Sequence, residues 1–249
     1  MAVGQAHPAG SPALLRSAIV SIAAVLLVLG VAAPVVGRAL GLGPVYVVTA
    51  LAGFLGAAGL ILSGLPAHQP FETFGPGNGV TLVRVAVLAL LAGLLGAGAT
   101  PNIAVAACAL GTVAAVLDAV DGRLARASGM ASRFGARFDL ETDAALVMIL
   151  ALLAWQLGKA GPWVLASGLA RYAFVAAGQV WTWLRRPLAP SFRRKAVAAV
   201  QMAVLVAALA PLIPPRASAL LAAAALAVLC WSFATDLLAL YRRSKEEPS

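Results

Sequence analysis

Long apolar segments recur along the whole chain of 249 residues. Each is about 20 residues long, and a helix of that length spans roughly 30 Å, the thickness of the hydrocarbon core of a bilayer. Eight such segments are predicted, at residues 17–36, 45–63, 80–98, 103–126, 137–158, 162–184, 196–213 and 217–240. The alternating ten-residue strands that a transmembrane β-barrel needs are absent from the sequence. The sequence therefore predicts an all-α polytopic membrane protein.

The composition agrees with a chain that is solvated by lipid. Hydrophobic residues make up 62% of the sequence and charged residues only 11%, and the mean hydropathy is +0.95. These values lie far from those of a soluble domain. The 24 glycines suit helices that approach one another closely inside a membrane. Composition therefore favours a bundle of membrane helices.

The net charge of +9 comes from basic residues that are sorted by membrane side, without the aromatic-laced basic patch that binds nucleic acid. If both termini are cytoplasmic, fourteen basic residues lie on the inner side: Arg16, Arg84, Arg123, Arg126, Arg133, Arg137, Arg185, Arg186, Arg193, Arg194, Lys195, Arg242, Arg243 and Lys245. Only Arg38, Lys159 and Arg216 fall outside, and Arg171 lies within a span. The positive-inside rule describes this asymmetry. We therefore expect an integral protein of a bacterial cytoplasmic (inner) membrane, with both termini in the cytoplasm.

A Gly- and Pro-rich stretch, GLPAHQPFETFGPGNG, divides the chain because such residues interrupt helices. The predicted organisation is a cytoplasmic segment at 1–16, an N-terminal transmembrane hairpin at 17–63, a linker at 64–79, a six-helix core at 80–243 and a cytoplasmic tail at 244–249. The first apolar run is longer than the hydrophobic region of a secretory signal, so we expect a retained span. The N-terminal hairpin has no predicted role beyond packing or a dimer contact.

The carboxylates are concentrated in one stretch, LDAVDGRLARASGMASRFGARFDLETD, residues 117–143. Five of the nine acidic residues lie there: Asp118, Asp121, Asp139, Glu141 and Asp143. At 100° per residue, Asp118 and Asp121 share a face of one helix, and Asp139 and Asp143 share a face of the next. The two helices are antiparallel about a turn near Met130, so Asp118 is level with Asp143, and Asp121 with Asp139. Four carboxylates are therefore expected to converge near the cytoplasmic side of the bilayer.

Converging carboxylates inside a membrane need cations, because each unpaired charge costs on the order of 3 kcal/mol and mutual repulsion adds to this cost. Oxygen ligands without Cys or His favour hard cations, Mg²⁺ or Mn²⁺, and four carboxylates suffice for a pair of ions about 4 Å apart. The alternative is a structural ion-pair network with Arg123, Arg126, Arg133 and Arg137. That network does not explain the small residues on the acidic faces, Gly122, Ala125 and Gly135, which leave space for a flat or phosphorylated ligand. Glu141 points away, toward Arg137.

The spacing of these residues forms a motif. Asp118-x₂-Asp121-Gly122-x₂-Ala125-Arg126-x₈-Gly135-x₃-Asp139-x₃-Asp143 resembles, at all eight positions, the motif of the CDP-alcohol phosphatidyltransferase family. The stretch NGVTLVR is also similar to the entry into the first core helix of that family, with Asn78, Thr81 and Arg84 in matching places. The resemblance covers about residues 78–243. The N-terminal hairpin lies outside it.

The resemblance implies a fold, a reaction and a set of site residues. The expected fold is a six-helix catalytic core, usually homodimeric, with a polar cavity that faces the cytoplasm. A hydroxyl would attack the lipid-linked phosphorus of a CDP-alcohol, commonly CDP-diacylglycerol, and CMP would leave. By the same resemblance the metal ligands would be Asp118, Asp121, Asp139 and Asp143, and Asp143 would also be the general base. The residues that would accommodate the CDP moiety are Asp121, Gly122, Ala125, Arg126, Gly135, Asn78 and Thr81.

Basic residues outside the motif are candidates for contacts with the acceptor alcohol. Arg171 lies inside a predicted span, where an arginine is by default a functional residue, although snorkelling or pairing with the aspartates competes. Arg193, Arg194 and Lys195 begin the next helix at its cytoplasmic end, where topology or attraction to lipid headgroups explains them equally well. We expect a phosphorylated polyol, glycerol phosphate or inositol phosphate, with unphosphorylated serine, inositol or choline as the alternative.

Two other functions compete with phosphatidyl transfer. A cation transporter would use the aspartates as a transport site, but internal repeats or interrupted helices in corresponding halves would be expected, and the sequence shows neither. A family member without activity, kept as an assembly partner, is disfavoured by the complete motif. The two histidines, His7 and His68, and the two cysteines show no metal-ligand spacing and have no predicted role in a site.

Overall fold

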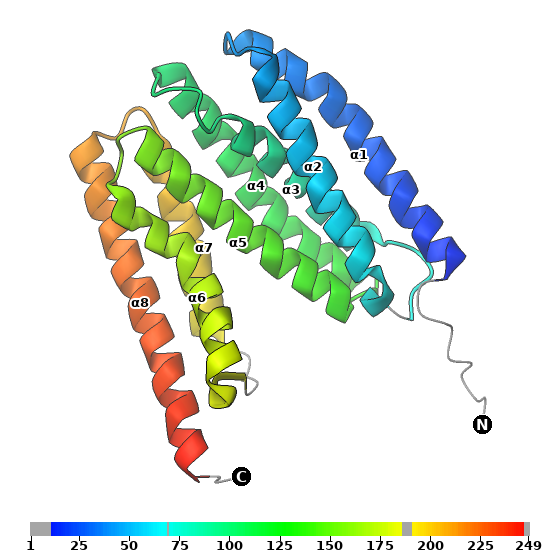
Figure 1. Ribbon diagram of the computed structural model, residues 1–249, viewed down its shortest axis with the longest axis vertical. Helices are drawn as coiled ribbons and strands as arrows, with labels where there is room; N and C mark the ends of the chain where they lie inside the picture. Colours follow the sequence, from blue (N-terminus) through cyan, green and yellow to red (C-terminus); the bar gives the residue numbers. More distant parts are fainter. Residues whose placement is uncertain (1–10, 69, 186–190, 247–249) are drawn as a thin grey trace. The chain divides into compact units, whose positions relative to one another are not determined.

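The computed structural model describes residues 11–68, 70–185 and 191–246 (Figure 1). Within these ranges, eight α-helices span Pro12–Ala39 (α1), Pro44–Gly64 (α2), Pro76–Gly93 (α3), Pro101–Ala127 (α4), Arg133–Gln156 (α5), Ala166–Val180 (α6), Phe192–Leu209 (α7) and Pro215–Glu246 (α8). Three short 3₁₀ helices cover Leu65–His68 (η1), Pro162–Leu165 (η2) and Thr182–Arg185 (η3). The described ranges contain no strand. The predicted all-α architecture is confirmed, while His7, Arg186 and the end of the predicted tail lie outside the described residues.

Prolines, more than the apolar pattern, mark where the helices begin. Five of these eight helices start at a proline, which suits the first turn because its missing N–H needs no partner there. α3 therefore begins four residues before the predicted start at 80, and Asn78 lies in its first turn. At the N-terminus, α1 continues through Pro34 to Ala39, past its predicted end at 36. A proline inside a helix removes one backbone hydrogen bond, and a membrane helix can tolerate this loss.

The predicted span at 162–184 is divided into three pieces: η2, α6 and η3. Between α6 and η3, Trp181 is extended, with φ −107° and ψ 105°. Gly178 and the β-branched Val180 lower helix propensity just before this break. With 15 residues, α6 is about 22 Å long, shorter than the hydrocarbon core. The prediction of one continuous helix here is wrong.

Within the part of the chain that the structure describes, five helical segments are long and apolar enough to cross a membrane: Pro12–Ala39, Pro44–His68, Pro76–Gly93, Pro101–Ala127 and Pro215–Arg242. This number is smaller than the eight predicted spans. Three features account for the difference. α5 carries acidic residues in its first half, α6 is short, and α7 begins with basic residues. The five apolar segments make the chain an integral membrane protein.

The first of two compact units comprises Met1–Ala97 and Ala109–Asp143. Within it, α1 packs on α2, and both helices pack on α3; α1 and α2 lie side by side in Figure 1. The buried ring of Tyr46 on α2 fills the space left by Gly93 on α3, where an added Cβ would come 2.8 Å from ring carbons. Gly37 on α1 faces the same ring. The N-terminal hairpin is therefore packed against the first helix of the predicted core.

The second unit comprises Gly98–Cys108 and Ala144–Ser249. Within it, α7 packs along α8, and α6 contacts α8. The buried Lys159 stabilises the end of α7, because its Nζ donates to the carbonyl oxygens of Ala210 (2.8 Å) and Ile213 (2.6 Å). Carbonyl groups at a helix C-terminus lack partners within the helix, and a cation is favourable there. Lys159 therefore binds the C-cap carbonyl of α7 and the turn that leads into α8.

Candidate active site

The acidic motif lies on a helical hairpin formed by α4 and α5. The reversal after α4 uses Gly129 in the left-handed conformation (φ 68°), and the N–H of Met130 donates to the carbonyl oxygen of Ala125 at 3.2 Å. Ser132 then caps α5, because its Oγ accepts from the N–H of Gly135 at 3.0 Å. The predicted turn near Met130 is confirmed.

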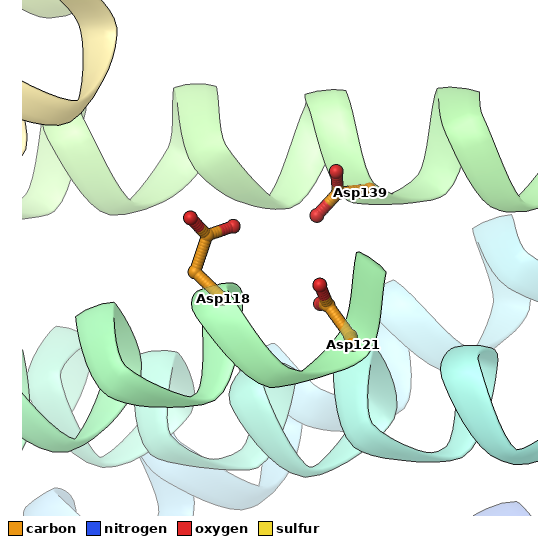
Figure 2. Close-up of side chains that lie close together, drawn as sticks. All are labelled: Asp118, Asp121 and Asp139. Atoms are coloured by element: carbon orange, nitrogen blue, oxygen red, sulfur yellow. The ribbon is translucent and has the colours of Figure 1, made fainter. Parts of the chain in front are cut away.

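The hairpin brings the aspartates face to face. In Figure 2, the carboxylates of Asp118 and Asp121 on α4 and of Asp139 on α5 point toward one another. One oxygen from each of the three lies within 4.8 Å of the other two. Asp121 is buried, whereas Asp118 and Asp139 are half-buried. Helical periodicity and the antiparallel register are sufficient to predict this convergence, because both are local properties of the hairpin.

The guanidinium group of Arg84, from α3, lies among the four aspartates. Its Nη1 is 2.9 Å from Asp118 Oδ1, 2.8 Å from Asp121 Oδ2 and 2.8 Å from Asp139 Oδ1. Its Nη2 contacts Oδ1 of Asp143. The Arg84 side chain is fully buried, and its planar fork of N–H donors reaches several carboxylates from one point. One positive charge offsets only part of four negative charges, so the cluster still attracts cations.

The position of Arg84 differs from the structural ion-pair network that is predicted as the alternative to a metal site. The arginines of that alternative network, Arg123, Arg126, Arg133 and Arg137, are all exposed. The buried counter-charge comes instead from Arg84, one helix away. Arg84 compensates the aspartates from inside the bundle, and the exposed arginines remain available to water, lipid or ligand.

Asn78, Thr81 and Arg84 lie on one buried face of α3, because they are spaced three residues apart. The hydroxyl of Thr81 donates to Asp121 Oδ2 at 3.0 Å, beside the contact of Arg84 with the same oxygen. Asn78 Nδ2 donates to the carbonyl oxygen of Phe74 at 2.6 Å. This face therefore holds Asp121 in place and orients the amide of Asn78.

The small residues of the motif allow helices to approach closely. Gly77 on α3 lies against Ala125 on α4, where an added Cβ would come 2.8 Å from the Ala125 Cβ. An added Cβ on Gly135 would come 2.9 Å from Asn78 Oδ1, and one on Gly122 would come 3.3 Å from Nη1 of Arg126. Close packing between helices is thus a second reason for Ala125 and Gly135 to be small, beside the predicted space for a ligand, whereas the neighbour of Gly122 is the flexible end of Arg126 on the same helix.

The donor set of the cluster fits a hard divalent cation. Asp118, Asp121 and Asp139 offer only oxygen atoms, and these atoms are close enough to share one ion. Carboxylate oxygens are the ligands that Mg²⁺ and Mn²⁺ prefer. Asp143 joins the cluster through its contact with Arg84. The aspartate cluster can therefore hold a metal ion.

The residues predicted to contact an acceptor, Arg171, Arg193, Arg194 and Lys195, belong to the second unit. Nη1 of Arg193 donates to the carbonyl oxygen (2.8 Å) and hydroxyl (2.7 Å) of Ser232, and Nη2 donates to Asp236 Oδ1 (2.5 Å). Arg194 lies 3.3 Å from the same Asp236 oxygen. Because Asp236 is buried on α8, these contacts tie α7 to α8. They favour a structural role for Arg193.

Two fully buried residues organise the site without a predicted role in it. Arg84 matches the family motif by position, but the spacing of the motif does not predict that its side chain lies among the aspartates. The sequence feature that could have indicated this role is an arginine inside an apolar span. His68, in η1, contacts Ser132 and Asn78. A histidine in a Gly- and Pro-rich loop gives no sequence signal, because its partners lie far along the chain.

Comparison with known protein families assigns the segment that carries the aspartate cluster to a family. The family model described as CDP-alcohol phosphatidyltransferase matches residues 76–233, more than half of the chain. The match begins at the first residue of α3 and contains Arg84 and the four aspartates. No curated protein and no solved structure matches the chain. Because the matched segment covers more than half of the chain and carries both the complete motif and the aspartate cluster, the chain belongs to the CDP-alcohol phosphatidyltransferase family.

Proposed function

We propose that the protein moves the phosphatidyl group of CDP-diacylglycerol to a small phosphorylated polyol, such as glycerol phosphate or inositol phosphate, and releases CMP. Its family makes it a membrane transferase that acts on a CDP-alcohol and an alcohol acceptor. The observation that carries the proposal is the convergence of four aspartates around Arg84. Serine, inositol or choline would use the same chemistry as alternative acceptors. We further propose a homodimer, as the family resemblance implies.

In the proposed reaction, an acceptor hydroxyl oxygen attacks the lipid-linked phosphorus, and the bond from this phosphorus to CMP breaks. The hydroxyl proton passes to Asp143, the proposed general base. Asp143 contacts Arg84 through Oδ1 and is 32% exposed, so its second oxygen can accept a proton from a substrate. A base must lie within hydrogen-bond reach of the proton that it removes. Arg84 keeps the Asp143 carboxylate directed toward the cluster.

Members of the family use a divalent metal, and the proposed ligands here are Asp118, Asp121, Asp139 and Asp143, for a two-ion site of Mg²⁺ or Mn²⁺. When bound, such ions supply charge neutralisation for the diphosphate. The proposed contacts with the CDP moiety come from Asp121, Gly122, Ala125, Arg126, Gly135, Asn78 and Thr81. Arg126 is exposed at the end of α4, where its charge can meet a phosphate.

The direct test is CMP release by purified protein in lipid nanodiscs. The reaction contains CDP-diacylglycerol, Mg²⁺ or Mn²⁺, and one acceptor at a time from a panel of phosphorylated and unphosphorylated alcohols. We expect CMP only when donor, metal and a suitable acceptor are all present. Absence of CMP with every acceptor, together with metal-ion flux across proteoliposomes, would favour the transporter alternative.

Arg171 is the proposed contact for an acceptor phosphate, with help from Arg194 or Lys195. Charge-assisted hydrogen bonds to a phosphate are worth about 1.5–3 kcal/mol each, more than those to neutral hydroxyls. We expect Arg171→Ala to raise the acceptor KM about 10-fold or more. Arg171→Lys keeps the charge but loses the bidentate geometry, so an intermediate KM is expected. Steady-state kinetics with varied acceptor measure both effects.

The control for this prediction is the donor. The KM for CDP-diacylglycerol is expected to change less than about twofold in both Arg171 variants, since its diphosphate is assigned to the aspartate cluster and Arg126. An unchanged acceptor KM in Arg171→Ala, or a preference of the wild type for serine, inositol or choline, would contradict a phosphorylated acceptor. Phosphatidyl transfer itself would remain supported by CMP release.

We propose a cytoplasmic active site in a bacterial cytoplasmic membrane, with both termini on that side. Single cysteines at Ser191 and Ser244, in a background that lacks Cys108 and Cys230, are expected to react with a membrane-impermeant maleimide only from the cytoplasm. A cysteine at Gly161 is expected to react only from outside. Labelling of whole cells and of inverted vesicles distinguishes the two sides. Reaction at Ser191 in whole cells would reverse the proposed orientation.

A further inference from the structure

The connection between α2 and α3 reaches the site from outside the segment that the family match covers. The match begins at residue 76, whereas His68 ends η1 and has 0% exposed surface. The His68 ring packs between Phe71 and Phe134, at centroid distances of 5.4 and 5.5 Å. A buried imidazole needs hydrogen-bond partners for its ring nitrogens. These partners lie at the start of α5 and in the segment that leads into α3.

The partners of His68 define its tautomer. Nε2 lies 3.0 Å from the carbonyl oxygen of Thr73, which can only accept, so Nε2 carries the hydrogen. Nδ1 therefore accepts a hydrogen bond from the hydroxyl of Ser132, at 2.7 Å. The amide nitrogen of Asn78 lies 3.4 Å from Nε2 and, because both are donors, this approach is a packing contact. His68 thus joins the linker to the residue that caps α5.

Ser132 links His68 to the first turn of α5. Its hydroxyl hydrogen is directed at His68, which leaves its oxygen lone pairs to accept from the N–H of Gly135 at 3.0 Å. Gly135 is also the point at which α5 touches α3, because an added Cβ would come 2.9 Å from Asn78 Oδ1. The hydrogen bond from Ser132 to His68 therefore positions Gly135 against Asn78.

A second connection reaches Asn78 from α1. Ser17 Oγ accepts a hydrogen bond from the N–H of Phe74 at 3.1 Å, and the carbonyl oxygen of Phe74 accepts from Asn78 Nδ2 at 2.6 Å. The ring of Phe74 is buried and packs against Phe134 and Phe138 of α5. The N-terminal hairpin and its linker therefore hold both sides of the Asn78–Gly135 contact.

We infer that His68 is a positioning residue for binding of the CDP moiety, acting through Ser132 and Gly135, and that the linker between α2 and α3 thereby supports the donor site. This inference rests on the proposed function, in which Asn78 and Gly135 contact that moiety. Asp143 lies two turns beyond Gly135 on α5, and Arg84 holds it separately. Loss of the His68 contact is therefore expected to weaken donor binding far more than it slows the chemical step.

The test compares His68→Phe with Ser132→Ala in the full-length protein in nanodiscs. Phenylalanine keeps the ring and its aromatic contacts but cannot accept from Ser132. Loss of a buried hydrogen bond should raise the KM for CDP-diacylglycerol about 10-fold in each variant. We expect kcat and the acceptor KM to change less than about threefold. Both changes remove the Ser132–His68 hydrogen bond, while His68→Phe also loses the bond to Thr73 and Ser132→Ala the one from Gly135. The double variant should therefore shift the donor KM by clearly less than the product of the two single effects.

Two further variants separate positioning from general packing. His68→Asn places an amide oxygen near the position of Nδ1, so the donor KM is expected to return to within about threefold of the wild-type value. Ser63→Ala removes a hydroxyl from the same part of the chain, where it donates only to the carbonyl oxygen of Leu60 at 2.8 Å. This matched control is expected to leave the donor KM unchanged. If His68→Phe does not fold, Ser132→Ala and His68→Asn decide the question.

The inference and the proposed function would each be refuted by a separate result. An unchanged donor KM in His68→Phe and Ser132→Ala, with CMP release by the wild type intact, would overturn the inference alone. A decrease in kcat and in thermal stability, together with an increase in both KM values, would also overturn the inference, because that pattern indicates general unfolding. If the wild type releases no CMP from CDP-diacylglycerol, the proposed function fails. Calorimetry with CDP then decides the inference: a Kd about 10-fold weaker in His68→Phe supports it, and an equal Kd refutes it.

Discussion

Replacement of Asp143 by Asn is expected to reduce CMP release by about 10³-fold while leaving the affinity for CDP-diacylglycerol within about threefold of the wild-type value. General-base catalysis contributes about 10²–10⁴-fold, and an amide cannot take the proton of the acceptor hydroxyl. The amide oxygen of Asn can still accept from Nη2 of Arg84, so the cluster should keep its shape. Single-turnover CMP release and equilibrium binding of the donor measure the two effects separately.

Two neighbouring acidic residues provide controls. Glu141 is exposed two residues before Asp143, so Glu141→Gln should retain near-native turnover. Asp118→Ala removes a proposed metal ligand and should instead raise the concentration of Mn²⁺ that is needed for half-maximal activity. Near-native turnover in Asp143→Asn would disprove its assignment as the base. An equal loss of turnover in Glu141→Gln would show that charge near the site, and not proton transfer, is what matters.

Replacement of Arg84 by Met is expected to destabilise the first unit by about 3–5 kcal/mol and to abolish CMP release. The substitution removes the buried cation from four aspartates, and breaking a buried ion pair by removing one partner has this cost because the other charges lose their compensation. Thermal unfolding in detergent and CMP release in nanodiscs measure the effect. Arg84→Lys should unfold at a higher temperature than Arg84→Met, since it keeps one charge but loses the forked geometry.

The matched control is Arg123→Met, which removes the same charge from an exposed position on α4. Its unfolding temperature should stay within about 2 °C of the wild-type value, because exposed charges contribute little. Added Mg²⁺ or Mn²⁺ should raise the unfolding temperature of Arg84→Met more than that of Arg123→Met, since a bound cation compensates the carboxylates. A wild-type unfolding temperature in Arg84→Met would exclude Arg84 as the buried counter-charge.

The aspartate cluster illustrates what can be predicted from one sequence. The convergence of Asp118 and Asp121 on α4 with Asp139 and Asp143 on α5 depends only on helical periodicity and on a short turn. Both are encoded within 27 consecutive residues, 117–143. The cation among them comes from α3, more than 30 residues earlier, and its approach depends on how α3 packs. Gly77 against Ala125 permits that packing, and no pairwise spacing in the sequence reveals such a contact in advance.

The lengths and apolar character of the helices, the acidic hairpin and the family motif are local properties, and for that reason the sequence by itself determined the membrane location, the all-helical fold and the class of reaction. The tertiary structure alone decided which residues meet across helices. Arg84 became the counter-charge of the aspartates, and His68 became a partner of Ser132, because packing brings together groups that lie 34–64 residues apart along the chain. Those contacts depend on burial and side-chain shape summed over several helices, which helical periodicity does not encode.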